Sequence, residues 1–180
     1  MKLLLHSCCG PCSIYPIEQL RQEGYDVNAY FYNPNIHPYK EFRRRLETLE
    51  GYTSAINVPL IKEETYELES FLQKVAQDPA SRCPHCYRMR LYKAAEKGRQ
   101  LSMDAFTTTL LISPYQNHEM LKALGEEIGK ELSIPFLYKD FRHGFREGQQ
   151  QARERELYRQ PYCGCIYSEK DRYYKPKKEE

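Results

Sequence analysis

The residues of this sequence best suited to chemistry are its seven cysteines. They fall into three groups: Cys8, Cys9 and Cys12; Cys83 and Cys86; and Cys163 and Cys165. In a reducing cytosol, clustered cysteines usually bind metal or carry out redox chemistry, because structural disulfides do not persist there. The spacing therefore predicts a thiol site that binds a metal ion or cluster, or that exchanges electrons.

Three kinds of site are compatible with these residues. Cys9-Gly10-Pro11-Cys12 has the spacing of a thioredoxin-like redox motif, although that function would leave the other five cysteines without a role. Cys83-x2-Cys86 together with a second cysteine pair could supply the four sulfurs of a structural zinc site, which is typical of small, loop-rich modules. Four cysteines from converging loops could instead bind an iron–sulfur cluster, which tolerates varied spacing. The spacing alone leaves all three open.

The composition is that of a soluble globular protein, because 41% of the 180 residues are hydrophobic and 29% are charged. We expect one domain spanning residues 1–180, with a charged tail from about residue 172 onward. No apolar run approaches the roughly 20 residues of a membrane span, so we expect a cytoplasmic protein. The 27 Lys and Arg against 25 Asp and Glu neither require nor exclude a nucleic-acid partner.

Short β-rich runs alternate with stretches of helical spacing along the chain. The runs expected to be strands are Lys2–Leu5, Val27–Tyr32, Ile56–Ile61, Met103–Thr108 and Ile134–Tyr138. Apolar residues at helical spacing occupy residues 14–20, 39–49, 68–75, 91–98 and 121–128. This alternation predicts an α/β fold, a doubly wound parallel sheet with helices on both faces. Ligands of such sheets bind where strands turn into helices, and Cys8, Cys9 and Cys12 lie at the first such turn.

Four motifs stand out when the whole chain is considered. They are Leu3–Ser13 (LLLHSCCGPCS), Cys83-x2-Cys86 preceded by Arg82 and followed by Arg88-x-Arg90-Leu91, Phe106–Pro114 (FTTTLLISP) and Leu157–Ser168 (LYRQPYCGCIYS). Together they resemble the QueH family of cobalamin-independent epoxyqueuosine reductases, over nearly the whole chain. Any one motif would be weak, whereas four in the right order are highly specific.

The resemblance implies an oxidoreductase that reduces the epoxide of epoxyqueuosine, at the wobble position of a tRNA anticodon, to the cyclopentene of queuosine. This is the last step of queuosine biosynthesis. The resemblance further implies a HUP/PP-loop-like (Rossmann-like) domain and a 4Fe–4S cluster bound by Cys8, Cys9, Cys83 and Cys86. Cys163 and Cys165 match a redox-active pair. Cys12 matches the motif without a settled role and is a candidate ligand of one additional iron ion.

The partners implied by the resemblance are a tRNA bearing epoxyqueuosine and an electron donor, either a reductase or a ferredoxin. Related PP-loop domains cradle phosphate with a glycine-rich first turn. In this chain the same turn contains Pro11 and three cysteines in place of those glycines, so we expect no ATP binding. A structural zinc protein and a thioredoxin-like thiol–disulfide protein remain the alternative functions.

Other polar residues are candidate contacts, each with an ordinary structural role as the alternative. His6 and His85 are candidate proton donors, and Tyr158 and Tyr162 could stack on bases. Polar residues that follow strands are candidate substrate contacts: Asn33, Asn35, Thr107–Thr109 and Ser113. The basic residues that could hold tRNA phosphates are Lys40, Arg43, Arg44, Arg45, Arg153, Arg155, Arg159, Lys175, Lys177 and Lys178.

Overall fold

A computed structural model describes residues 1–175 of the chain. At its centre is a sheet of four parallel strands in the order β3-β2-β1-β4. The strands are β1 (Lys2–His6), β2 (Asp26–Tyr32), β3 (Leu60–Glu63) and β4 (Ala105–Thr108). In this register Leu5 of β1 lies opposite both Ala29 of β2 and Thr107 of β4, so β1 is central.

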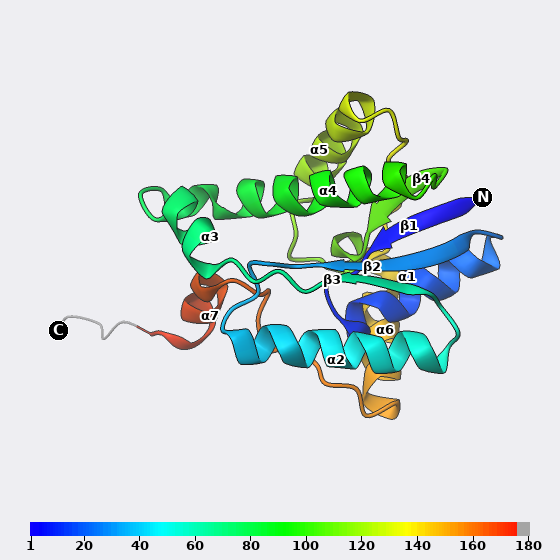
Figure 1. Cartoon of the computed structure of the whole chain (residues 1–180). Coiled ribbons are helices and arrows are strands. Elements are labelled where there is room, and N and C mark those ends of the chain that lie inside the picture. The colour runs from blue at the N-terminus through cyan, green and yellow to red at the C-terminus, as the bar shows by residue number, and fades with distance from the viewer. Residues whose placement is uncertain (176–180) are drawn as a thin grey trace.

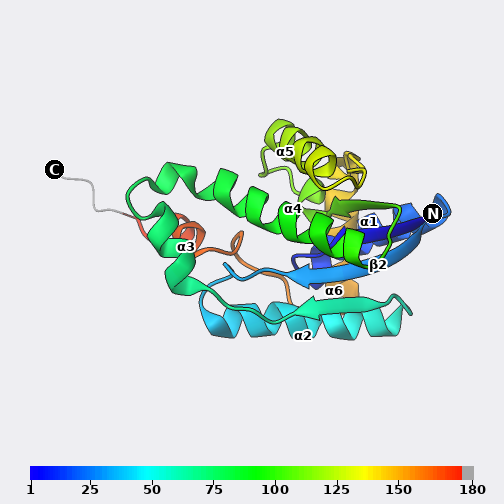
Figure 2. The same cartoon turned by 45° about the horizontal axis from the view of Figure 1, so that its top comes forward.

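Helices cover both faces of the sheet (Figures 1 and 2). One face carries α1 (Gly10–Gln22), α2 (Tyr39–Ala55) and α6 (Phe145–Glu154), and the other carries α4 (Arg82–Gln100) and α5 (His118–Glu131). Two short helices, α3 (Leu68–Val75) and α7 (Ile166–Tyr173), lie near the start of α4 in both views. The doubly wound α/β architecture predicted from the sequence is therefore confirmed.

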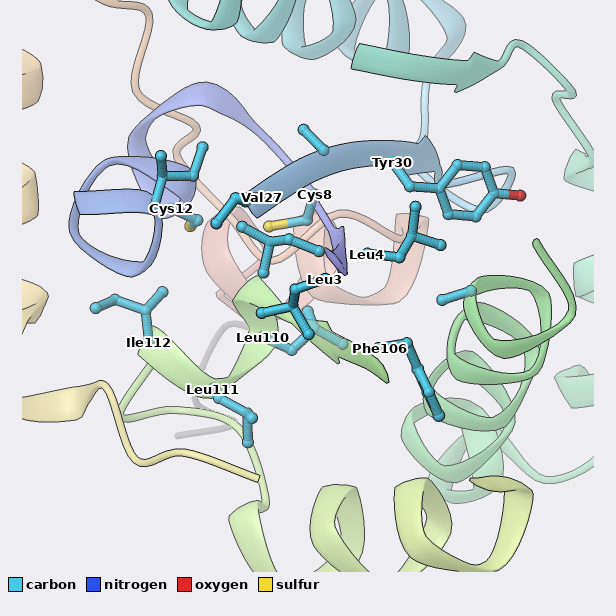
Figure 3. Close-up of a cluster of buried hydrophobic side chains, with 14 of the residues drawn as sticks. Leu3, Leu4, Cys8, Cys12, Val27, Tyr30, Phe106, Leu110, Leu111 and Ile112 are labelled. Atoms are coloured by element: carbon cyan, nitrogen blue, oxygen red, sulfur yellow. The ribbon is translucent and has the colours of Figure 1, made fainter. Parts of the chain in front are cut away.

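The core forms around β1, in which Leu3, Leu4 and Leu5 are all fully buried. Successive strand residues point to opposite faces, so an uninterrupted apolar run suits a strand that is covered by helices on both sides. Figure 3 shows Leu3 and Leu4 within a cluster that also contains Phe106 and the buried Cys8. The thiol at the end of this strand thus lies at the border of the main hydrophobic core.

The order of the strands makes the carboxyl end of β1 a topological switch point of the sheet. The chain passes from β1 to β2 and β3 on one side and then returns to place β4 on the other side. Connections that leave β1 and β4 diverge to opposite faces, and ligands of open α/β sheets bind at such a switch point. Cys8 follows β1 and Thr109 follows β4, and the backbone N–H of Cys8 donates to Thr109 Oγ1 at 3.1 Å.

Two of the expected strands differ from those observed. Residues 134–138 form a single bridge between Phe106 and Phe136 instead of a strand, and Pro135 within that segment has no N–H to donate. The third strand begins at Leu60 rather than at Ile56, because α2 continues to Ala55 and Ile56 closes its last turn.

The C-terminal third contains two helices that the sequence did not predict. In α6 only Gly148 and Ala152 are buried, and no residue of α7 is fully buried. Of the residues of α6 only Phe145 and Ala152 are apolar, so a search for apolar residues at helical spacing does not find this helix. The expected tail is partly wrong, because Arg172 and Tyr173 belong to α7; its end, residues 176–180, lies outside the described residues.

Candidate active site

Cys8, Cys9 and Cys12, here called the cysteine trio, lie in the turn between β1 and α1. Their Sγ atoms all lie within 4.8 Å of one another, and those of Cys8 and Cys9 are 3.7 Å apart. All three side chains are buried. Cys9 is the residue before the helix and Cys12 lies three residues later, so the first helical turn brings the two sulfurs to the same side.

The three thiols of the cysteine trio differ in pKa. Hydrogen bonds from the Cys12 and Cys9 thiols hold the pKa of Cys8 well below its usual range, and the Thr109 hydroxyl, 3.4 Å from Cys8 Sγ, adds to this effect. Burial raises the pKa of Cys9, and hydrogen bonding to Cys8 raises that of Cys12. Of the three, Cys8 is therefore the cysteine whose thiolate, the form that ligates metal, is most favoured.

Cys83 and Cys86 lie at the start of α4, which begins nine residues before the helical spacing expected from the sequence at residues 91–98. Burial raises the pKa of the Cys86 thiol to about 11. Burial also raises the pKa of Cys83, and the nearby thiols of Cys163 and Cys165 raise both pKa values further. The second and third cysteine groups, which are far apart in sequence, therefore lie close enough to interact electrostatically.

The segment Cys163–Cys165, here called the Cys-Gly-Cys loop, is held through its backbone. Arg45 of α2 donates from Nη1 to the carbonyl of Cys163 at 2.7 Å and from Nη2 to that of Tyr162 at 2.9 Å. The backbone N–H of His37 donates to the carbonyl of Gly164 at 2.8 Å, and that of Ile166 donates to His37 Nδ1 at 3.2 Å. The loop backbone is thus fixed, whereas the Cys163 side chain is exposed.

Arg45 is a structural residue and not the phosphate contact suggested by its basic neighbours. Its side chain is only 1% exposed and donates from Nε to Glu41 Oε1 at 2.7 Å. The sequence could not separate it from Arg43 and Arg44, because the three are adjacent and only one faces inward. Every acceptor of this guanidinium lies inside the protein.

Replacing Arg45 by Gln should lower the free energy of unfolding by about 3–5 kcal/mol, because Glu41 then remains as an unpaired buried carboxylate. Denaturant unfolding followed by circular dichroism measures this change. Arg43→Gln is the matched control, since Arg43 pairs with Glu47 and Glu64 at the surface, and its unfolding midpoint should stay at the wild-type value. Equal midpoints for the two variants would contradict the assigned role of Arg45.

Two glutamines contact the thiols, and sequence reasoning missed both. Gln160 donates from Nε2 to Cys12 Sγ at 3.2 Å, and Gln116 donates to Cys163 Sγ at the same distance. The Oε1 atom of Gln160 is buried and has no hydrogen-bond partner among residues 1–175. Gln160 stands three residues before Cys163 in the last motif, and this position was the only signal that could have identified it.

His6 is a structural residue of the sheet edge. Burial, followed by the charge of Arg90, lowers its pKa to about 4, so the ring is neutral at neutral pH. Its Nε2 lies 3.1 Å from the carbonyl of Tyr32 and its Nδ1 lies 2.9 Å from Thr108 Oγ1. Since the carbonyl can only accept, Nε2 carries the proton and Nδ1 accepts from the hydroxyl. The ring thereby joins the ends of β1, β2 and β4.

His37 makes the stability of the protein depend on pH. Burial, and then the charge of Arg90, lowers its pKa from 6.5 to about 4. Between pH 6.5 and pH 4, His37 is protonated in the unfolded chain but not in the folded chain. Its contribution to the free energy of unfolding is therefore fully present above pH 6.5 and is lost as the pH falls toward 4. A shift of this size corresponds to at most about 3 kcal/mol.

The His37→Asn variant should remove this contribution, because an amide oxygen can still accept from Ile166 without titrating. Between pH 7 and pH 4 the free energy of unfolding of the wild type should fall by up to about 3 kcal/mol more than that of the variant. A constant difference across this range would contradict the prediction.

The remaining candidates show mixed outcomes. Tyr158 donates to Glu41 Oε2 at 2.6 Å and lies under the Arg44 guanidinium, and Tyr162 donates to the carbonyl of His37 at 2.5 Å. Both tyrosines are therefore packed. The basic residues that form no ion pair within residues 1–175 include Lys40, Arg44, Arg153 and Arg159, and Arg155 pairs with Glu18. Lys177 and Lys178 lie outside the described residues.

The fold and the site together define a class of protein, a doubly wound α/β protein with a buried thiolate group at the carboxyl edge of its parallel sheet. In that class of fold this edge is where ligands bind and chemistry takes place. The family model described as "Epoxyqueuosine reductase QueH" matches residues 3–171. The chain belongs to this family and is an oxidoreductase of queuosine biosynthesis, as the four motifs predicted.

Similar proteins agree with this membership. The chain is 36% identical to the epoxyqueuosine reductase QueH of Dehalococcoides mccartyi, an alignment that covers 97% of this chain and 96% of that protein. It is 32% identical to the protein of the same name from Thermotoga maritima, covering 92% and 89% of the two chains. With the Streptococcus pyogenes protein of that name it shares 34% identity over 93% of this chain and 70% of the relative.

Solved structures support the fold. A predicted subunit of tRNA methyltransferase from Methanocaldococcus jannaschii superposes with a TM-score of 0.57 at 12% identity, covering 86% of this chain and 75% of that one. The zinc-inhibited form of a teicoplanin deacetylase superposes with a TM-score of 0.53 at 13% identity, covering 86% and 83%. At these identities the likeness concerns architecture alone. In residues 1–175, no helix is long and apolar enough to cross a membrane.

Proposed function

We propose that this protein reduces epoxyqueuosine carried in tRNA to queuosine, with a 4Fe–4S cluster as its resident cofactor. Membership of the QueH family supports the reaction. The observation that supports a thiolate-bound metal centre is the cysteine trio, whose three sulfurs lie within 4.8 Å of one another at the carboxyl end of β1. Soft thiolates select soft metal centres such as zinc or iron–sulfur clusters over hard cations, so this donor set fits the cofactor.

We assign the cluster to Cys8, Cys9, Cys83 and Cys86. Cys8 and Cys9 stand at the start of α1, and Cys83 and Cys86 stand at the start of α4, so both pairs have the positive end of a helix dipole nearby. The charge of Arg90 acts on both Cys8 and Cys86, which supports their placement around one centre. Cys12, the third sulfur of the trio, is left as a candidate ligand of one additional iron ion.

The electrons and protons of the reaction balance with two thiols. Converting an epoxide to an alkene consumes two electrons and two protons and releases water. Oxidation of the Cys163 and Cys165 thiols to a disulfide releases two electrons and two protons. The cluster, when bound, would carry electrons one at a time. An external donor, a reductase or a ferredoxin, must then reduce the disulfide for the next turnover.

Exposed basic residues beside the Cys-Gly-Cys loop are the proposed tRNA contacts. Arg44 lies 3.7 Å above the ring of Tyr158, and Arg159 follows that tyrosine directly in the chain. Both arginines are exposed and form no ion pair within residues 1–175, so their charges are available to phosphates. Arg159 stands six residues before Cys165, and Arg44 contacts Tyr158 of the same segment, so phosphates bound by these arginines would lie near the thiols.

An anaerobic assay with epoxyqueuosine-containing tRNA and a chemical reductant tests this function directly. The wild-type protein should form queuosine in the tRNA, and the purified protein should contain iron and sulfide at cluster stoichiometry. Stoichiometric zinc without iron and without activity would favour the structural zinc alternative. Disulfide reduction of insulin, equally lost in Cys9→Ser and Cys12→Ser, would favour the thioredoxin-like alternative.

ATP should not bind, because Pro11 stands at the first turn of α1 and removes one of the backbone N–H groups that would cradle phosphate there. Isothermal titration calorimetry with MgATP should give no heat of binding. Tight binding would contradict this proposal.

A further inference from the structure

Arg90 carries a buried positive charge without a carboxylate partner. It lies on α4, four residues after Cys86, and its side chain is only 2% exposed. Its Nε and Nη2 atoms donate to Asn35 Oδ1 at 3.1 and 2.7 Å, and Asn35 is a neutral residue. Within residues 1–175 it takes part in no ion pair, although burying an unpaired charge is strongly unfavourable.

Arg45, the second buried arginine of the site, has the carboxylate partner that Arg90 lacks within residues 1–175. Arg45 is equally buried, but it is paired with Glu41 and donates to two backbone carbonyls. Both guanidinium groups approach the same point of the Cys-Gly-Cys loop, because a Cβ built on Gly164 would lie 3.4 Å from Arg45 Nη1 and 3.8 Å from Arg90 Nη2. The site thus contains two buried cations and one buried carboxylate to balance them.

Arg90 lies among the cysteines of the site. Cys86 stands four residues before it on the same face of α4, and Gly164, which its Nη2 approaches, lies between Cys163 and Cys165. Asn35, which fixes the guanidinium through Oδ1, has a buried Nδ2 donor without a partner among the described residues. One buried pair of side chains therefore offers both charge and a free N–H to the thiolates.

We propose that Arg90, oriented by Asn35, is the buried counter-charge of the metal–thiolate centre and a positioning residue that raises its reduction potential. The inference rests on the proposed metal centre. A metal centre with four thiolate ligands carries net negative charge, which a fixed cation stabilises, and the more negative reduced form is stabilised most. Arg90 touches no reacting atom, so its effect is exerted through the centre.

The proposal predicts opposite effects of one substitution on the empty and the loaded protein. Arg90→Gln removes the charge and keeps a donor for Asn35. In the metal-free protein, an uncompensated buried charge is lost, so the melting temperature should stay equal to that of wild type or rise. In the loaded protein the counter-charge is lost, so metal affinity should fall by about tenfold to hundredfold, as for other residues that support a metal site indirectly.

The experiment measures the melting temperature of metal-free and reconstituted proteins, metal release to a chelator, and the reduction potential by anaerobic titration. Arg90→Gln should show the reversal between the two states and a more negative potential, whereas Arg90→Lys, which keeps the charge, should have a potential near that of wild type. Arg45→Gln is the control, and it should lower the melting temperature in both states.

Failure of the proposed metal centre and failure of the inference about Arg90 give different results. A wild-type protein that takes up no iron and sulfide, or zinc in their place, would overturn the proposed centre itself, and this inference with it. A loaded wild type together with an Arg90→Gln variant of unchanged potential would overturn this inference alone. Metal-free Arg90→Gln melting as far below wild type as Arg45→Gln would also overturn it, since Arg90 would then be merely structural.

Discussion

Cys8→Ser and Cys83→Ser should each yield a folded protein that has lost its cluster and, with it, at least most of its epoxyqueuosine reduction. A serine hydroxyl is a hard, weakly acidic ligand that replaces a soft thiolate poorly on iron. The two residues come from different turns of the proposed ligand set, one after β1 and one at the start of α4. Iron and sulfide content, visible absorbance and activity are measured on the same anaerobic preparations.

Cys12→Ser is the comparator for these two variants. It removes a third sulfur from the same buried trio but leaves the four proposed ligands intact. Its absorbance should therefore remain that of the cluster, while one additional iron per protein is lost if Cys12 holds it. Bleaching of Cys12→Ser, together with a retained cluster in Cys83→Ser, would show that the trio binds the metal centre and that α4 does not. The fold should persist in all three, because the apolar core around β1 is unchanged.

Cys163→Ser and Cys165→Ser should keep the absorbance of the cluster and yet stop turnover. In our proposal this pair supplies two electrons and two protons, and a single thiol cannot close a disulfide. The exposed side chain of Cys163 and the backbone hydrogen bonds of the loop allow the sulfur to be changed without disturbing its support. Single-turnover assays with pre-reduced protein and tRNA substrate measure the effect.

Gln116→Leu is a useful control for this loop, since it removes the N–H that donates to Cys163 Sγ while both thiols remain. It should slow turnover without abolishing it. If Cys163→Ser bleaches the cluster, the loop cysteines are ligands and our division of roles is wrong. If both serine variants retain full activity, the loop takes no part in electron transfer.

The parts of the fold that were predictable from the sequence are those with a regular pattern. Leu3, Leu4 and Leu5 form a run that only a strand buried on both faces can use, and α1, α2 and α4 show apolar residues at helical spacing. The strand expected around Phe136 was wrong, because aromatic and branched residues occur both in strands and in extended segments that form only one bridge. In α6 the buried positions are Gly148 and Ala152, which no hydrophobicity pattern reveals.

The site was predictable only in its cysteines. Their spacing identifies them whatever the surroundings, and the same motifs led to the family. The residues that support them are distant in sequence: Arg45 holds a loop more than a hundred positions later, and Asn35 holds Arg90 across 55 positions. Neither contact leaves a local pattern in the sequence. A buried basic residue therefore cannot be distinguished from an exposed one by its sequence neighbours. Their roles follow only from burial and from the identity of their partners.

The central position of β1 in the sheet has a consequence for the nascent chain. β1 and the cysteine trio are synthesised before β2, β3 and β4, and the strand acquires its second neighbour only with β4, which Thr109 follows. At about 5–20 residues per second, roughly a hundred further residues take about 5 to 20 s to appear. During that interval Cys8, Cys9 and Cys12 lack the cover that the finished core provides. Oxidants in the cell can therefore oxidise these three thiols during translation. Anaerobic growth should increase the yield of protein that can take up metal.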